Sequence, residues 1–159
     1  MRGLLVWLEG TAVATAMREW TWLYPLVETL HILSFVVLVG AAAMFDLRLL
    51  GASPGLSVKL MARHLLPWAR AGLACAVPTG LLLFATDATT LATNPALGAK
   101  LTALVLAIVN AQAFHRRTYK GVAAWDHEAA TPPAAKLAAV ASLVLWAAVV
   151  ALGRLIAYV

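Results

Sequence analysis

The sequence predicts an all-α fold, an integral membrane four-helix bundle preceded by a short N-terminal interfacial helix. Two observations carry this prediction. The 159 residues are 63% hydrophobic and 12% charged, with a mean hydropathy of +0.87, which is more apolar and less charged than a soluble domain. The chain also contains four long apolar stretches, and about 20 such residues cross a hydrocarbon core of roughly 30 Å.

The first element is residues 1–19. Arg2 and a short apolar run resemble a signal peptide, but Glu9 interrupts the run within a few residues. Trp7 and the neighbouring leucines suit a short helix that lies in the membrane interface, and Trp20 and Trp22 form an aromatic belt where the first span begins. We therefore expect residues 1–19 to lie on the membrane surface.

The four spans are expected near residues 20–45, 65–86, 97–114 and 137–158, and together they make 1–159 a single transmembrane domain. Their Leu, Ala and Val content favours helices, because barrel strands alternate apolar and polar residues. Pro78 and Gly80 are expected to kink the second helix.

The basic residues predict the orientation. The first and third connections carry Arg48, Lys59, Arg63, Arg116, Arg117, Lys120 and Lys136. The second connection, residues 87–96, carries no Lys or Arg. The basic loops are therefore expected in the cytoplasm and both termini outside, which is the periplasm for a bacterial inner membrane. This topology also accounts for the net charge of +5 without a nucleic-acid partner.

Polar residues of the outer layer are the first candidates for a site. Glu28 and His31 lie three residues apart on one helix face inside the first span, where ionisable groups point to function. Lys100 and Arg154 are expected at a similar depth. His31 can offer a ring nitrogen to a haem iron, with Lys100 or Arg154 neutralising the propionates. A structural hydrogen bond of Glu28 with His31 or Lys100 is the alternative.

The inner layer offers a second pair. His64 begins the second span and His115 ends the third, so antiparallel helices bring them to similar depth. They are either axial ligands of a second haem or interfacial side chains beside arginines. Asp46 is expected to form an ion pair with Arg63 or Arg70 that locks the first two spans together.

Seven segments resemble an uncharacterised family of small bacterial four-helix membrane proteins, and the resemblance covers nearly the whole chain. The segments are LYPLVETLH, FDLRLLG, LLPWARAG, PTGLLLFATDA, NPALGAK, NAQAFHRR and GRLIAY. More distantly, the order of His31, Lys100 and His115 is similar to that of HemJ-type protoporphyrinogen oxidases, which are haem b proteins. This resemblance implies His31 as axial ligand and Lys100 near the haem. Copper-resistance D-type membrane domains share a similar layout, which implies metal handling instead.

These observations predict a haem b-binding inner-membrane protein that exchanges electrons with a quinone or porphyrin-like partner. An enzymatic role, as a haem-dependent oxidoreductase, would depend on the cofactor, because the chain has no nucleophile elbow, phosphate loop or zinc motif. One alternative is a cofactor-free structural or accessory subunit of a membrane complex or homo-oligomer. Another is the handling of copper or another metal.

Overall fold

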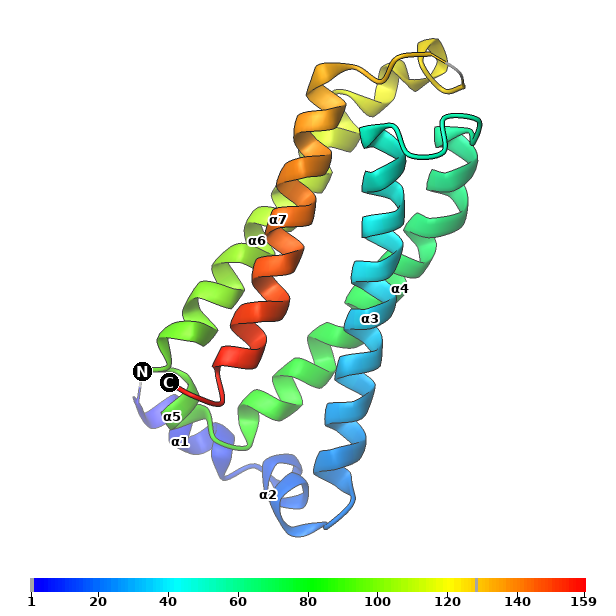
Figure 1. Ribbon diagram of the computed structural model, residues 1–159. Coiled ribbons are helices and arrows are strands. Elements are labelled where there is room, and N and C mark those ends of the chain that lie inside the picture. Colours follow the sequence, from blue (N-terminus) through cyan, green and yellow to red (C-terminus); the bar gives the residue numbers. More distant parts are fainter. Residues whose placement is uncertain (1, 128) are drawn as a thin grey trace.

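The computed structural model describes residues 2–127 and 129–159, and all regular elements among these residues are helices, as predicted (Figure 1). In chain order the elements are α1 (Arg2–Glu9), α2 (Ala12–Glu19), α3 (Leu23–Leu50), α4 (Val58–Ala85), α5 (Ala88–Leu91), α6 (Pro95–Arg116), the 3-10 helix η1 (Tyr119–Ala124) and α7 (Pro133–Leu155). Within the described chain, α3, α4, α6 and α7 are long and apolar enough to cross a membrane.

The observed helix ends differ from the predicted spans because local caps extend the helices past the apolar residues. The second span was expected to begin at residue 65, but α4 begins at Val58, where the Ser57 side chain accepts from the backbone N–H of Leu60. α3 continues to Leu50 and ends at Gly51, whose φ of 109° closes the helix. α7 begins early because Pro133 suits a first helical position.

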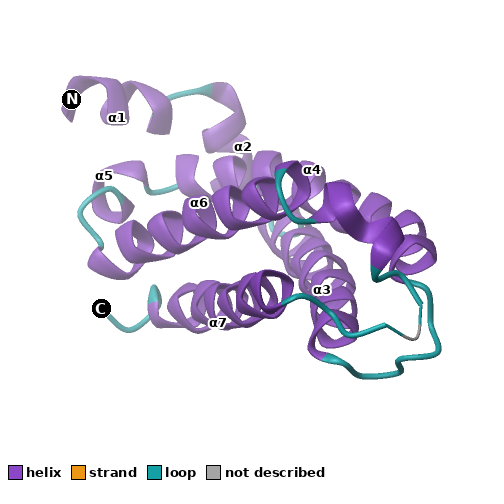
Figure 2. Cartoon of the chain, turned by 90° about the horizontal axis from the view of Figure 1, so that it is seen from above, coloured by secondary structure: helices purple, strands orange, loops and turns teal. Residues whose placement is uncertain are grey.

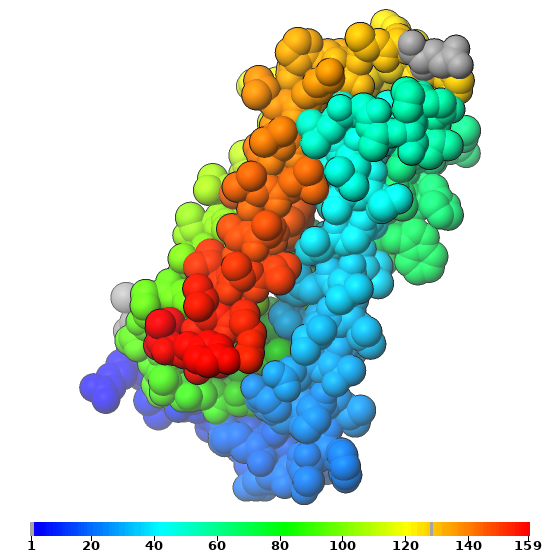
Figure 3. Space-filling model, viewed as in Figure 1, coloured from blue at the N-terminus to red at the C-terminus, as the bar shows by residue number. Residues whose placement is uncertain are grey.

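The four long helices form an open bundle. α3 packs on α4, α7 packs on α3 and α6 packs on α7, whereas α4 and α6 make little contact. The C-terminus and α1 lie at one end of the bundle, called here the termini end, and the α3–α4 and α6–α7 connections lie at the other, the loop end (Figure 1). Figure 3 shows α3 and α7 meeting toward the loop end and separating toward the termini end.

The closest approach of α3 and α4 occurs at Gly72. A Cβ placed there would lie 2.7 Å from the Ser34 carbonyl oxygen and 2.9 Å from the Leu38 backbone nitrogen. Only glycine permits this distance between the two backbones. α4 changes direction along its length (Figure 1), and Pro67 and Pro78 both lie inside this helix.

The termini end is closed by residues 2–19. They form two helices and not the single short helix expected, because the chain breaks at Gly10 and the Thr11 hydroxyl caps α2. Both helices lie on the side of the bundle away from α7 (Figure 2). The Glu9 carboxylate accepts from the backbone N–H of Thr89 at 2.6 Å and from its hydroxyl at 2.8 Å. These hydrogen bonds attach α1 to the short helix α5.

The loop end is held by Arg48 and Asp126. Arg48 is 3% exposed and donates to the backbone carbonyls of Leu56, Pro54 and Asp126. The Asp126 carboxylate accepts from the Ser57 hydroxyl at 3.0 Å and from the Lys59 backbone N–H at 2.8 Å. The α6–α7 connection is therefore fastened to the first turn of α4.

Most of the apolar surface of the long helices faces outward. Only 17–28% of the residues in the most apolar window of each helix are buried. Large apolar side chains such as Leu33, Val36, Leu81, Val105 and Val144 are more than half exposed. A lipid bilayer is the environment that covers such a surface.

Candidate functional site

The first candidate site is the His31 cluster, which we define as His31, Phe35, Thr79, Gly80 and Lys100. The His31 ring of α3 lies half-buried against α4, where its Nδ1 is 3.0 Å from the Thr79 hydroxyl oxygen. That hydroxyl donates its hydrogen to the backbone carbonyl of Cys75 at 2.7 Å. Because the hydroxyl has only one hydrogen to donate, Nδ1–H must be the donor to it. The other ring nitrogen, Nε2, then keeps its lone pair.

Gly80 makes room for the imidazole. A Cβ at this position would lie 3.0 Å from the His31 Cε1 atom. α4 therefore offers the His31 ring a hydrogen-bond acceptor at Thr79 and, one residue later, a flat surface at Gly80. Together they fix both the tautomer and the position of the ring, which is how an accessory hydrogen bond prepares a histidine for a metal.

Lys100 reaches the same cluster from α6. Its Nζ lies 5.3 Å from the centroid of the Phe35 ring, and that ring meets His31 edge-on at 5.1 Å. The aliphatic part of Lys100 lies over Gly153 of α7, where a Cβ would be 3.4 Å from Nζ. Three spanning helices thus contribute residues to the cluster and the fourth, α7, packs against Lys100 through Gly153. The cluster places a cation close to His31, as the sequence predicted.

Two other candidates of the outer layer, Glu28 and Arg154, lie outside the His31 cluster. Glu28 is exposed on α3, one turn before His31. Arg154 is exposed on α7, donates to the Tyr158 hydroxyl at 2.6 Å and lies over the ring of that tyrosine at 4.9 Å. Neither is seen to bond to His31.

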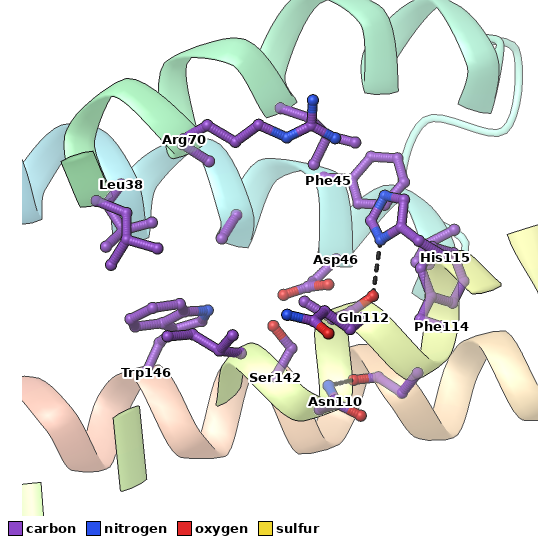
Figure 4. Close-up of a pocket in the computed structure, with 18 residues that line it drawn as sticks. Leu38, Phe45, Asp46, Arg70, Asn110, Gln112, Phe114, His115, Ser142 and Trp146 are labelled. Atoms are coloured by element: carbon purple, nitrogen blue, oxygen red, sulfur yellow. Dashed lines mark hydrogen bonds between the residues drawn. The ribbon is translucent and has the colours of Figure 1, made fainter. Parts of the chain in front are cut away.

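The second candidate site is the Asp46 cavity, a volume of about 270 Å³ between the long helices. Its wall is mostly apolar and includes Leu38, Phe45, Leu66, Leu73, Ile108 and Trp146. Its polar side chains come from four helices: Asp46 of α3, Arg70 of α4, Asn110, Gln112 and His115 of α6, and Ser142 of α7 (Figure 4). The exposed lining residues are Arg70, Ala111 and Gln112. The mouth of the cavity therefore lies between α4 and α6.

Asp46 is 6% exposed, and its carboxylate lies on the same side of the cavity as the Ser142 hydroxyl of α7 (Figure 4). The Oδ2 atom of its carboxylate is buried without any hydrogen-bond partner. The expected ion pair with Arg63 or Arg70 is not formed, because Asp46 faces α7 while both arginines are exposed on α4.

His115 lines the same cavity, in contact with the rings of Phe45, Phe114 and Tyr119. Its Nδ1 lies 2.8 Å from the carbonyl oxygen of Ala111. Because a carbonyl only accepts, Nδ1 must carry a hydrogen, and Nε2 of the neutral ring is an acceptor. This Nε2 is buried without a partner.

His64, the predicted companion of His115, is exposed on α4 and does not line the cavity. The sequence-based pairing placed both histidines at similar depth, which says nothing about the direction in which each helix face points.

The pattern of helices and buried polar groups can be compared with known proteins. A family described as "Family of unknown function (DUF6644)" matches residues 5–159. The chain belongs to this family. No curated protein and no solved structure matches the chain. The prediction of an uncharacterised family is thereby confirmed, and the assignment of a site in this DUF6644 protein depends on its own geometry.

Within residues 2–127 and 129–159, no group of three or more His, Cys, Asp or Glu side chains is placed to hold a metal ion. A bare metal ion commonly needs three or four protein ligands. A haem iron needs only one or two, because the porphyrin supplies the others.

Sequence reasoning missed the partner residues of this DUF6644 protein. Thr79 and Ser142 are ordinary hydroxyl residues of apolar helices, and only the packing of α4 and α7 against α3 shows that they face His31 and Asp46. The signal that could have found Thr79 is its position between Pro78 and Gly80, where a kink was expected.

Proposed function

We propose that this membrane protein binds haem b through His31 and takes part in electron transfer. The single observation that supports the proposal most is the fixed tautomer of His31. Its Nδ1–H is held by Thr79, so that Nε2 has a lone pair for an iron while the ring is kept in place.

The chemistry of the surrounding residues fits such a group. Lys100 places a positive charge beside Phe35 and His31. It would hold a propionate of the haem, or in its neutral form it would offer its amine to the iron. Haem supplies one-electron redox chemistry when bound, and the protein adjusts it through ligation, burial and nearby charge. The protein's own residues keep the His31 ring in place, keep its proton on Nδ1 and position Lys100 beside it.

A second haem between His64 and His115 is not part of the proposal. A cavity of roughly 150 Å³ holds one benzene ring, so the Asp46 cavity of about 270 Å³ has room for one substituted ring and not for four pyrroles. His64 also lies outside it.

The proposal includes the location and the partner. We place the protein in a bacterial inner membrane with the termini end on the periplasmic side, because the basic residues gather at the loop end. The electron partner is a quinone or a porphyrin-like molecule. The order of His31, Lys100 and His115, which resembles that of HemJ-type haem proteins, is a further reason for proposing haem b.

A second candidate function is that of a cofactor-free accessory subunit. One observation favours it: Thr79 provides a hydrogen-bond partner for His31 within the chain, as expected of a polar residue that only fixes the register of α3 on α4. This function needs no haem, and the experiment below separates the two.

The test is a reduced-minus-oxidised visible spectrum of the detergent-purified protein, expressed with ample haem, with His31→Ala and His64→Ala variants. We expect b-type Soret and α bands in the parent and in His64→Ala, which is the matched control because His64 is exposed. His31→Ala should lose them. A parent without any chromophore would overturn the haem proposal and support the accessory subunit. Bands that persist in His31→Ala would overturn His31 as the ligand.

A further inference from the structure

We propose that the Asp46 cavity is a binding site for the ring of a lipid-soluble quinol, a molecule with two hydroxyl donors. The choice of a quinol among hydroxylated rings rests on the electron-transfer function proposed above. The site itself rests on the geometry of the cavity.

The first step of the argument is the pair of unpartnered acceptors. Asp46 Oδ2 and His115 Nε2 are both buried, both belong to residues that line the cavity, and neither has a hydrogen-bond partner. A buried polar atom without a hydrogen-bond partner destabilises the folded protein. Two in one cavity indicate a ligand that brings hydrogen-bond donors.

The second step is the route of entry. The mouth lies between α4 and α6, the two long helices that make little contact. Because α4 and α6 are both spanning helices, a ligand that enters between them comes from the bilayer. The ligand must therefore dissolve in lipid, which excludes sugars and other strongly polar donors.

The third step is the shape and polarity of the interior. A volume of about 270 Å³ suits one substituted ring, since roughly 150 Å³ accommodates benzene. The rings of Phe45 and Trp146 form part of the wall and provide flat apolar contact. Arg70 is an exposed lining residue and can donate hydrogen bonds at the mouth. A hydroxyl group, which both donates and accepts, can therefore bond to Arg70 or to the acceptors inside. Hydroxyl groups on an aromatic ring meet all these conditions.

The direct test uses two probes on the full-length protein in lipid nanodiscs, prepared both with and without added haem. One probe is a short-chain benzoquinol kept reduced, and the other is its dimethyl ether, which has the same ring and no donor hydrogen. We expect saturable binding of the quinol in equilibrium dialysis and at least tenfold weaker binding of the ether. Equal affinity of the two, or no saturable binding of the quinol, would overturn the proposal.

Variants then locate the bound ring. Asp46→Asn replaces an acceptor oxygen with a donor group and should weaken quinol binding at least tenfold, while leaving the ether unaffected. Asp87→Asn is the matched control, because Asp87 is exposed between α4 and α5, and it should bind the quinol like the parent. Ala111→Leu, at the mouth, should weaken both probes. Unchanged quinol binding in Asp46→Asn would place the ligand elsewhere and overturn the site.

The comparison of the two probes on the unaltered protein does not depend on whether a variant folds. It also separates the two proposals. Failure of the haem spectrum with preserved quinol binding removes the redox function and leaves the cavity, whereas the opposite result removes the cavity and leaves the haem.

Discussion

At the termini end, Thr79 on the neighbouring helix holds the ring of His31, whereas at the loop end Asp46 and His115 each keep one buried atom without a partner. Both regions place polar groups among apolar helices. The first presents one fixed lone pair beside a cation, and the second presents two acceptors in a mostly apolar cavity. The two regions differ in whether their buried polar atoms already have hydrogen-bond partners. This property indicates which kind of ligand a membrane bundle can bind, more than the mere presence of a polar residue in a span does.

The strongest way to disturb both regions at once is to separate α3 from α4. Gly72→Ala places a Cβ 2.7 Å from a carbonyl oxygen and 2.9 Å from a nitrogen of the α3 backbone, so the helices must move apart. We expect a loss of about 1–3 kcal/mol in the free energy of unfolding, together with weaker binding at both sites. Unfolding in one detergent, followed by circular dichroism, measures it.

Gly40→Ala is the control for this prediction. Nothing lies within 4 Å of a Cβ at Gly40 in α3, so this variant should be at least as stable as the parent because alanine favours the helix. Equal stability of the Gly72 and Gly40 variants would contradict the close helix contact.

The next prediction affects the His31 cluster alone. Thr79→Val keeps the size of the side chain and removes the acceptor of the His31 Nδ1–H. Loss of such an accessory partner typically weakens metal affinity 10–100-fold. We expect a decrease of this size in haem affinity, measured by titration of the haem-free protein. Ser142→Ala, which removes the hydroxyl that lies near Asp46 in the cavity at the loop end, should leave haem affinity unchanged. A similar decrease in both variants would show that the two regions are not independent.

Hydropathy and the rise of an α-helix were enough to predict the four long helices and the depth of their polar residues. Four long stretches of Leu, Ala and Val specify four helices, and 1.5 Å per residue gives the depth of His31 and Lys100. These two residues do share one cluster. Depth does not specify rotation about the helix axis, which is why His64 was paired with His115 although it faces outward.

The direction of Asp46 was unpredictable for a related reason. An ion pair with an arginine of the next helix is the simplest expectation for an aspartate in a span, but the packing of α7 on α3 decided otherwise. The open side between α4 and α6 arises from the way whole helices pack, and no local pattern of residues encodes it.

A smaller effect is expected where the termini end is fastened. The Asn94 side chain accepts from the Leu97 backbone N–H at 3.1 Å and donates to the carbonyl oxygens of Ile156 and Val159. Asn94→Ala should lower the free energy of unfolding by about 1 kcal/mol, the usual cost of losing an N-cap. Thr93→Ala is the control, because its exposed hydroxyl bonds only to Thr90. If both variants unfold alike, Asn94 does not fasten the C-terminus.

The smallest effect concerns the carboxylates that fasten the two ends. The Thr89 backbone N–H and hydroxyl hold the pKa of Glu9 below its ordinary value. At the loop end, partial desolvation raises the pKa of Asp126, but hydrogen bonds from the Lys59 N–H and the Ser57 hydroxyl outweigh it, so this pKa is also lowered. A pKa lower in the folded than in the unfolded state stabilises the fold above the unfolded pKa, and the stabilisation disappears as the pH falls through the folded pKa.

Glu9→Gln and Asp126→Asn should therefore unfold at a lower temperature than the parent at pH 7, and the difference should shrink below about pH 4, near the ordinary pKa of these groups. The shift is expected to be small because both carboxylates are close to solvent. Thermal unfolding of the three proteins at pH 7 and pH 3 measures it. A difference that persists unchanged at pH 3 would mean that the shape of the hydrogen bonds, and not the charge, fastens the ends. A shift in one variant only would show that the two ends of the bundle rely on different interactions, as the two polar sites do.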